Sequence, residues 1–569
     1  MKSEIVFTLC IFLCISFASS ICGSSLATDK VNISSERLTG DSIKVWIFFT
    51  DKGESVGAIS KPTAVSSHAI ARRLSRAAAV DFAALDRSIS DDYLAQIQPY
   101  ILRVDNQSRW LNGVSAYINP SNLDDFARLE CVKEIQSVAV YRRPAEPLLP
   151  EIEILDKPTA PYPPEYGPSW SQMNQIQVPA LHTLGFKGDG VRILVMDTGF
   201  RIDHPVFVNT DIAATHDFIN DDEDVQDDGE IPATQQSHGT QTLSVIGANA
   251  PNLMLGVAYE ATFLLAKTEL YGPEIITEED DWVAGLEWGE AHGCDVVSSS
   301  LGYIDWYDYA DMDGNTAITT KAADIAASLG VMVVNSIGNG QRVSAQPTLI
   351  APSDGDSVFA IGAVTSGGEI THFSSNGPSA DGRVKPDLCA WGSGNTVANP
   401  TSNGLTTNSG TSFSCPLVAG TVALLIQAKP EWKFGEIFES LTSTATRANG
   451  PDSVFGYGIV RAFDALNYEN HEERNIVGIS AYPNPFATRV NFDFEVTPPG
   501  EVEIRIYTIA GEKVATITRP LGDPAPLTWN GTNQNGEEVA DGVYIAYILA
   551  EGISETRKVL KITSIINLD

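Results

Sequence analysis

Ser412 stands where a run of small residues opens into a long apolar segment. The stretch NSGTSFSCPLVAGTVALL covers residues 408–425, and Pro416 follows the serine by four positions. Serine favours helix starts and proline is tolerated in a first turn, so the stretch predicts the beginning of a buried helix. A second interpretation makes Ser412 a nucleophile, because a helix N-terminus offers free N–H groups and a positive dipole end to a developing oxyanion. That chemistry needs a base, a group that orients the base and a second oxyanion donor.

Three polar residues elsewhere in the chain have the right chemistry for these roles. Asp197 directly follows the apolar run 191–196, and Asn339 lies between two glycines after the apolar run 331–336. His238 precedes a glycine at the start of a helix-like segment. Groups at the carboxyl ends of parallel strands face a common crevice, so such residues can meet in space. Taken one at a time, each of them also fits a turn or a capping position.

Taken together, these residues form an ordered set of motifs that resembles the subtilisin-like serine peptidases. The matching motifs are Asp197-Thr198-Gly199, His238-Gly239-Thr240, Ser300-Leu301-Gly302, Gly338-Asn339-Gly340 and Gly410-Thr411-Ser412 with Pro416. The resemblance covers about residues 175–466.

The resemblance implies a role for each matched residue. Ser412 would attack the scissile carbonyl, and His238 would take its proton and later give it to the leaving amine. Asp197 would orient the imidazole, while the Asn339 side chain and the backbone N–H of Ser412 would hold the oxyanion. The segment 300–302 would be an edge strand that pairs with an extended substrate.

Two places in the chain depart from the common pattern of that family. Phe413, Ser414 and Cys415 replace the commoner Met-Ala-Thr after the serine. Cys415 lies one helical turn from Ser412, so it either confers sensitivity to thiol reagents or is inert packing. Ile337 replaces a small alanine before Gly-Asn and could alter the neighbouring pocket.

Near-continuous apolar runs predict the elements that hold these residues. The runs 191–196, 262–268, 294–301, 331–336 and 358–364 alternate with helical stretches at 277–293 and 317–330. Buried parallel strands that alternate with helices predict an α/β domain at 175–466, with a doubly wound, mostly parallel sheet covered on both faces.

Length and charge limit the classes of function. A chain of 569 residues is too long for one core and predicts several domains. The formal net charge of -35 argues against nucleic acid and against an anionic membrane surface as partners.

The N-terminus is typical of a targeting segment. Lys2 is followed by an apolar stretch at 5–17, and Ser25-Leu26-Ala27 fits a cleavage site, so we expect residues 1–27 to be a signal peptide. A membrane span is the competing interpretation, for which the apolar run is short.

A small block at 40–142 mixes strand patterns with helical patterns, such as a strand at 109–119 and a helical stretch at 69–87. A proline-rich segment follows at 143–174; it predicts a linker without regular structure that is open to a protease. The block resembles the inhibitor-like propeptides of subtilisin-like zymogens, mainly by its position, and would then act as a chaperone and temporary inhibitor. A permanent binding domain is the alternative.

The last part of the chain, 474–569, alternates charged and apolar residues with period two and has Asn-Gly and Asp-Gly turns. This pattern predicts an all-β sandwich. The segments ISAYPNPF (479–486) and WNGTNQNGEEVADGVY resemble the C-terminal sorting domains of type IX secretion substrates. A generic β-sandwich attached to an exported enzyme is the alternative.

Metal-binding and disulfide patterns are weak. Outside the leader, Cys131, Cys294, Cys389 and Cys415 are far apart, with no metal-ligand spacing. Acidic runs at 220–230 and 311–315 could bind structural calcium or could be solvated insertions, and neither has the full ligand spacing of a known loop. We expect no metal or other cofactor in the chemistry itself.

These features together predict a secreted serine endopeptidase that is made as a zymogen and is released or attached to the cell surface. Its expected partners are protein or peptide substrates, its own propeptide and a secretion machinery, and we expect a monomer. Two alternatives remain, namely an adhesion protein with an inactive protease-like domain and a processing enzyme with a narrow substrate range.

Overall fold

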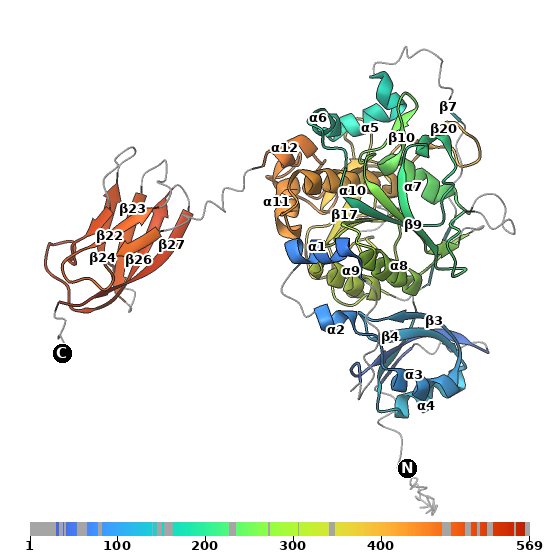
Figure 1. The fold of residues 1–569 in the computed structure, drawn as a ribbon, viewed down its shortest axis with the longest axis horizontal. Helices are drawn as coiled ribbons and strands as arrows, with labels where there is room; N and C mark the ends of the chain where they lie inside the picture. Colours follow the sequence, from blue (N-terminus) through green and yellow to red (C-terminus); the bar gives the residue numbers. More distant parts are fainter. Residues whose placement is uncertain are drawn as a thin grey trace, which may run out of the picture. The chain divides into compact units, whose positions relative to one another are not determined.

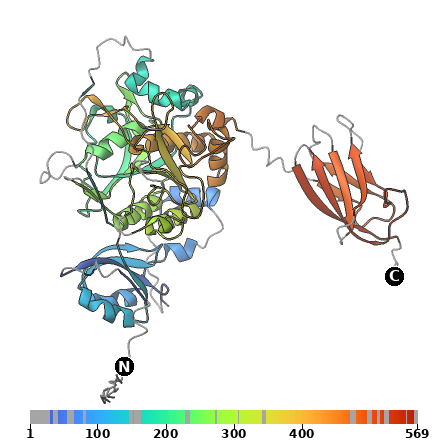
Figure 2. The ribbon, with the colours of Figure 1, turned by 180° about the vertical axis from the view of Figure 1, so that it is seen from behind.

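The structure is a computed structural model. It describes residues 30–33, 38, 41–53, 65–77, 82–138, 140–144, 151–152, 163–226, 235–270, 274–304, 307–340, 347–468, 479–494, 502–508, 513–519, 527–550 and 553–563. The expected signal peptide lies outside the described residues. The chain forms two compact units, Met1–Asn467 and Tyr468–Asp569, whose elements are drawn in Figures 1 and 2.

A seven-stranded sheet forms the centre of the larger unit. Its order is β18-β17-β16-β15-β8-β12-β9, and every neighbouring pair is parallel. The strands are β8 (Arg192–Asp197), β9 (Asp211–Asp217), β12 (Thr262–Lys267), β15 (Val296–Ser299), β16 (Met332–Ser336), β17 (Val358–Val364) and β18 (Leu388–Trp391). The predicted parallel α/β sheet is therefore confirmed. The apolar runs did not mark β9 and β18, because β9 carries few large apolar residues and β18 has only four residues.

Helices cover both faces of this sheet. Alternate side chains of β8 enter two different cores: Ile193 and Val195 pack on one face, and Leu194 and Met196 pack on the other. The first core contains residues of α7 (Ser237–Gly247) and α10 (Thr411–Ala428), and the second contains residues of α8 (Glu279–Ala291) and α9 (Ile318–Ser328). The inner strands β8, β12 and β17 are largely apolar because neither of their faces meets water.

Helix α10 runs through the first core. Its N-cap is Gly410, so Ser412 lies inside the first turn rather than capping it. Among the described residues, α10 is the one helix long and apolar enough to cross a membrane, with a mean hydropathy of 1.5, but 89% of that window is buried inside the protein. A helix that is apolar on every side is expected at the centre of a core.

Shorter elements complete the part of this unit that contains the seven-stranded sheet. They are η5 (Pro164–Ser169), α5 (Trp170–Gln175), α6 (Val178–Thr183), η6 (Pro205–Phe207), β10 (Asn249–Ala250), β11 (Met254–Leu255), β13 (Glu269–Leu270), β14 (Glu274–Glu278), η7 (Tyr309–Asp311), β19 (Asn395–Ala398), β20 (Leu405–Asn408), α11 (Phe434–Thr444) and α12 (Ala462–Leu466).

The prediction that the proline-rich segment 143–174 lacks regular structure is wrong for its described residues. Strands at Val140–Pro144 and Glu151–Ile152 lie partly or wholly within it. In its last part η5 and α5 form, and Tyr166 and Met173 are buried in the same core as α10. Prolines are compatible with such short helices when they stand in the first turn.

A separate small core lies in the N-terminal part of the same unit. A five-stranded sheet has the order β1-β5-β2-β4-β3. The elements are β1 (Val31–Asn32), β2 (Ile43–Phe49), α1 (Ser67–Arg76), α2 (Phe82–Asp86), α3 (Asp91–Ile97), η3 (Gln98–Tyr100), β3 (Ile101–Ser108), β4 (Gly113–Ile118), η4 (Pro120–Asn122), α4 (Leu123–Arg128), β5 (Val132–Ser137), β6 (Val140–Pro144) and β7 (Glu151–Ile152). The predicted α+β character is confirmed. Residues 109–112, which the sequence pattern assigned to a strand, instead form the turn between β3 and β4.

The smaller unit consists of two antiparallel sheets, β21-β22-β25 and β24-β23-β26-β27. Their strands are β21 (Ile479–Tyr482), β22 (Val490–Phe494), β23 (Val502–Thr508), β24 (Lys513–Arg519), β25 (Leu527–Trp529), β26 (Gly542–Ala550) and β27 (Ile553–Lys561). Trp529 packs against Phe486 and Tyr544 with ring centroids 5.4 and 5.0 Å apart, and its indole N–H donates to the Thr532 carbonyl at 2.9 Å. The predicted all-β tail is confirmed.

Because the two units have separate cores, we expect them to unfold separately. Trp529→Ala should destabilise the smaller unit by about 3–5 kcal/mol, the usual loss for a buried tryptophan, and leave the larger unit unchanged. Differential scanning calorimetry of the full chain would show this as a shift of one transition. Trp282→Ala, which removes a fully buried tryptophan from the larger unit, is the matched control and should shift the other transition. A common shift of both transitions by either variant would contradict independent cores.

Candidate active site

Asp197 is the last residue of β8 and lies completely buried. Its Oδ1 lies 2.7 Å from Nδ1 of His238 and accepts the backbone N–H of Thr198 at 2.8 Å, while Oδ2 accepts the hydroxyl of Thr242 at 2.9 Å. Burial by itself raises the pKa of this carboxyl, but His238 and the hydrogen bonds outweigh it and hold the pKa below its ordinary value. Asp197 is therefore a carboxylate that can orient an imidazole.

His238 is the second residue of α7. The next residue, Gly239, allows the helix to approach the end of β8 closely. A methyl group added at Gly239 would lie 2.2 Å from the carbonyl oxygen of Gly199 and 3.0 Å from Cβ of Asp197. Any larger residue would push α7 away from the end of β8. The His-Gly pair is thus required by packing as well as by chemistry.

Ser412 is the second residue of α10, at the same edge of the sheet. Its carbonyl accepts the hydroxyl of Ser300 at 2.9 Å. Asn339 follows the end of β16, and its Oδ1 accepts the backbone N–H and the hydroxyl of Thr411 at 3.0 and 2.9 Å. These contacts join the loops after β15 and β16 to the first turn of α10.

Oγ of Ser412 and Nε2 of His238 are both buried, and neither has a hydrogen-bond partner among the described residues. The neighbouring Phe413 ring packs against the imidazole, with centroids 5.9 Å apart. The structure therefore brings Asp197 and His238 into contact and places Ser412 next to them without a serine–histidine hydrogen bond. Such bonds are often long in enzymes without substrate and tighten when substrate binds.

The segment Ser300–Gly302, which we expected to be an edge strand, continues past the end of β15 without ladder pairing of its own. Its Leu301 carbonyl accepts the side-chain amide of Asn335 at 2.9 Å. The next residue, Tyr303, forms an antiparallel bridge with Ala351. The segment is thus fixed at both ends beside the site.

Cys415 and Ile337, which differ from the common pattern of the family that the sequence resembles, are both buried in the core. The thiol of Cys415 donates to the carbonyls of Ser299 and Val334 at 3.3 and 3.4 Å, and burial raises its pKa to about 12. A buried thiol that keeps its proton is unreactive, which favours the packing interpretation. Ile337 is also fully buried, in a small cluster with Leu349 and Ala351.

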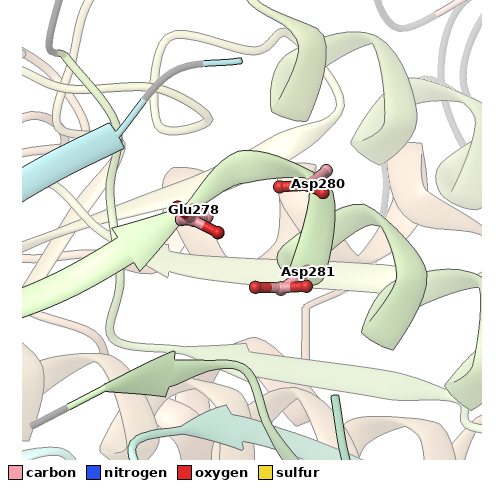
Figure 3. Close-up of side chains that lie close together, drawn as sticks. All are labelled: Glu278, Asp280 and Asp281. Carbon is pink, nitrogen blue, oxygen red and sulfur yellow. The ribbon is translucent and has the colours of Figure 1, made fainter. Parts of the chain in front are cut away.

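A group of carboxylates that the sequence did not single out lies at the start of α8. Among the described residues, Glu278, Asp280 and Asp281 form the one carboxylate group whose ligand atoms all lie within 4.8 Å of one another (Figure 3). The cation that contacts it is the ammonium of Lys44 from β2, 2.5 Å from Glu278 and 3.0 Å from Asp280. Burial works against the charged ammonium, but the surrounding carboxylates outweigh it and raise the pKa of Lys44.

In the two acidic runs that we considered for calcium, 220–230 and 311–315, described carboxylates accept backbone N–H groups of nearby residues. Asp313 accepts the backbone N–H groups of Asn315 and Thr316, both at 2.8 Å, so it closes a turn. In the other run, only residues 220–226 are described, and there Asp222 and Asp224 each accept a backbone N–H two residues further on. No calcium ligands are assigned to either run.

The N-terminal part with the five-stranded sheet, from here on called the N-terminal domain, contacts α8 through both apolar and ionic groups. Trp46, Phe48 and Trp110 of the N-terminal domain belong to the same buried core as Trp282 and Leu286 of α8. Further along α8, the fully buried Glu290 pairs with three guanidinium groups, those of Arg72, Arg73 and Arg109. A buried charge is tolerated when it is paired and hydrogen-bonded in this way.

Two strand pairings bracket residues 145–150, which lie outside the described residues. Before them, β6 pairs antiparallel with β14, from Val140 opposite Glu278 to Pro144 opposite Glu274. After them, β7 pairs antiparallel with β20, the strand that leads towards Ser412. The chain is thus attached to the part that contains the seven-stranded sheet on both sides of this short interval.

Comparison with known families matches three successive parts of the chain. Residues 44–147 match the peptidase S8 propeptide domain of Bacteroidota, residues 188–458 match the subtilase family, and residues 480–562 match the secretion system C-terminal sorting domain.

Relatives of the central part include bacterial subtilisins. The chain is 29% identical to subtilisin E of Bacillus subtilis over 294 residues, which is 51% of this chain and 68% of that protein. It is 29% identical to the subtilisin of Bacillus pumilus over 294 residues, 95% of that protein, and 29% identical to subtilisin BL of Lederbergia lenta over 296 residues, 96% of that protein. With the parallel sheet and the site at its carboxyl edge, these matches identify the protein as a serine peptidase of the subtilase family with an S8 propeptide and a C-terminal sorting domain for export.

Proposed function

We propose that the protein is an exported serine endopeptidase, made as a zymogen, in which Ser412 is the nucleophile. The observation that carries this proposal is the hydrogen bond between Asp197 and His238, beside a serine in the first turn of a core helix. Three separate elements, β8, α7 and α10, supply these groups, and an adhesion domain would have no need of the arrangement.

The proposed reaction begins with the attack of Ser412 Oγ on the carbonyl carbon of the scissile bond. Nε2 of His238 takes the hydroxyl proton and then donates it to the leaving amine, which gives an acyl-enzyme. Asp197 keeps the proton on Nδ1 and stabilises the imidazolium. A water molecule, activated by the same imidazole, then releases the acid product and restores the serine. No step requires a cofactor.

The oxyanion of each tetrahedral intermediate needs donors, and we propose the Asn339 side chain and the backbone N–H of Ser412. Because Thr411 donates twice to Oδ1 of Asn339, the amide of this side chain is fixed and its Nδ2 is the half that can serve as donor. A fixed donor stabilises the developing charge without reorganising.

Replacing this donor should slow the chemical step. Asn339→Ala should lower kcat by about 100- to 1,000-fold with little change in KM, because the lost hydrogen bond is formed mainly in the transition state. Steady-state kinetics on a peptide substrate would measure both constants. Asn249→Ala, which removes an amide that bonds Tyr259 away from the site, is the control and should leave both constants unchanged. An equal loss of kcat in the two variants would contradict the proposal that Asn339 is an oxyanion donor.

We further propose that residues 40–142 act as the inhibitor of the folded zymogen and that the activating cut falls within residues 145–150. The support is the pair of strand contacts on either side of this interval, β6 with β14 and β7 with β20. We place the start of the catalytic domain near Pro164, where η5 starts, rather than at residue 175. We propose residues 1–27 as the signal peptide and residues 474–569 as the sorting domain.

Expression of residues 28–569 tests the nucleophile and the cut together. The unaltered chain should lose its N-terminal domain and show a new N-terminus within residues 146–151, while Ser412→Ala should stay intact. N-terminal sequencing and intact mass over time would measure this. Ser414→Ala, which changes a buried serine in the same helix, is the control and should be processed normally. Equal cutting of the Ser412→Ala chain would mean that another protease makes the cut.

The attachment of the N-terminal domain should depend on pH through Glu287 of α8. This carboxylate accepts the Ser108 hydroxyl at 2.5 Å and the Trp110 backbone N–H at 3.3 Å, and Arg109 lies 3.6 Å away. Burial raises the pKa of Glu287 from 4.5 to about 7, against the opposing effect of Arg109. A carboxyl that is exposed after release returns towards its ordinary pKa, so attachment takes up a proton between pH 4.5 and 7.

The processed N-terminal domain should therefore bind most tightly at acidic pH. As the pH rises from about 4.5 to 7, deprotonation of Glu287 should weaken binding by up to tenfold per pH unit. Above pH 7, Glu287 should cause no further loss of affinity. Inhibition of the processed enzyme by its own N-terminal domain, measured from pH 4 to 8, would show the slope. Glu287→Gln should flatten this slope, and Glu431→Gln, an exposed control, should not. An unchanged slope in Glu287→Gln would show that a group other than Glu287 causes the pH dependence of binding.

A further inference from the structure

The proposed catalytic groups determine where the residue that precedes the scissile bond must lie. Its carbonyl carbon has to reach Ser412, and its carbonyl oxygen has to reach Asn339. Two backbone segments border this position, Ser300–Gly302 after β15 and Gly338–Gly340 after the neighbouring parallel strand β16. An extended substrate that pairs with the first segment directs the side chain of this residue into the space between the two segments.

The side chain of Ile350 already lies in that space. Gly302 and Gly338 border it without side chains of their own, and Ile350 lies against both. A methyl group added at Gly302 would be 2.1 Å from Cδ1 of Ile350, and one added at Gly338 would be 3.1 Å from the same atom. Both distances are shorter than an ordinary contact between carbon atoms, so Ile350 fills the gap between the two glycines.

The backbone around Ile350 is fixed, so this side chain cannot swing away with its loop. The Ile350 carbonyl accepts the backbone N–H and the hydroxyl of Ser353 at 3.0 and 2.5 Å. The next residue, Ala351, exchanges two backbone hydrogen bonds with Tyr303, of 2.9 and 3.2 Å. Leu349, on the other side, is buried in the cluster that includes Ile337. Ile350 itself is only partly buried, as expected for the floor of an open subsite.

We propose that Ile350 closes the floor of the subsite for the residue that precedes the scissile bond, so that this peptidase cleaves after Gly, Ala and Ser and rejects large apolar or aromatic side chains there. The inference rests on the proposed peptidase function and names its substrate class. A small side chain fits above Ile350, whereas Phe or Leu would have to occupy the volume that Ile350 holds.

The test uses the processed full-chain enzyme and a set of peptides that differ only at this residue, as Ala, Ser, Leu or Phe. The variants are Ile350→Ala, which opens the floor, and Ile350→Val, which removes one methylene and preserves the fold. Ile212→Ala, a partly buried isoleucine on the distant edge strand β9, is the matched control. Titration with a fluorophosphonate counts active sites, so kcat/KM is compared per active enzyme.

The unaltered enzyme and the Ile212→Ala control should prefer Ala over Phe by about tenfold or more in kcat/KM. Ile350→Ala should raise kcat/KM for the Phe peptide by about 10- to 100-fold and change the Ala peptide by less than about threefold. Ile350→Val should fall between them.

The inference is overturned if the unaltered enzyme cleaves the Phe peptide as well as the Ala peptide, or if Ile350→Ala leaves the ratio between them unchanged. Failure of the proposed function has a different signature: a protein whose Ser412 is not an activated nucleophile would not react with the fluorophosphonate, and a protein that is no peptidase would cleave none of the peptides.

Discussion

The buried charge of Asp197 is the constraint on which the site depends. A carboxylate without water is costly unless hydrogen bonds compensate it, and here the donors are His238, Thr242 and Thr198. Two of these donors belong to α7, so the helix must pack directly on the end of β8. That approach is possible only because Gly239 has no side chain.

The position of Ser412 follows from the same packing. Helix α7 shares its core with α10, so the docking of α7 on β8 also determines where the first turn of α10 lies. The carbonyl of Ser412 is bonded to Ser300, and Thr411 is bonded to Asn339. Each proposed catalytic group is therefore fixed by a neighbour from another element, which is what a preorganised site requires.

The contact between the N-terminal domain and α8 depends on the same balance between burial and pairing. Carboxylates of α8 face Lys44 and the arginines of the N-terminal domain, and they share an interface with buried tryptophans. Buried ion pairs add little net stability compared with apolar packing, but they are strongly unfavourable when one partner is missing. The N-terminal domain is thereby held in one register, and the release that we propose would return these carboxylates to water.

Several features of the structure had no signal in the sequence. The pattern drew attention to Ile337, which is buried beneath the site, whereas Ile350 is the isoleucine that lies between Gly302 and Gly338. The pattern also passed over Glu278, Asp280 and Asp281, because the cation they meet comes from a segment more than 200 positions away. The sequence pattern did not predict strand β9. Its composition does not favour a strand, and it forms one because it pairs with β12.

By itself, the sequence determined the parallel α/β sheet, the order of the three folded parts and the candidates Asp197, His238, Asn339 and Ser412, because apolar runs and the residues at their ends are local patterns. Only the tertiary structure decided which side chains meet: that Asp197 touches His238, that Lys44 pairs with Asp280 at the start of α8 and that Ile350 fills the space between Gly302 and Gly338. The physical reason is that burial and electrostatic pairing depend on distances between segments far apart in the chain, and no local pattern of residues specifies those distances.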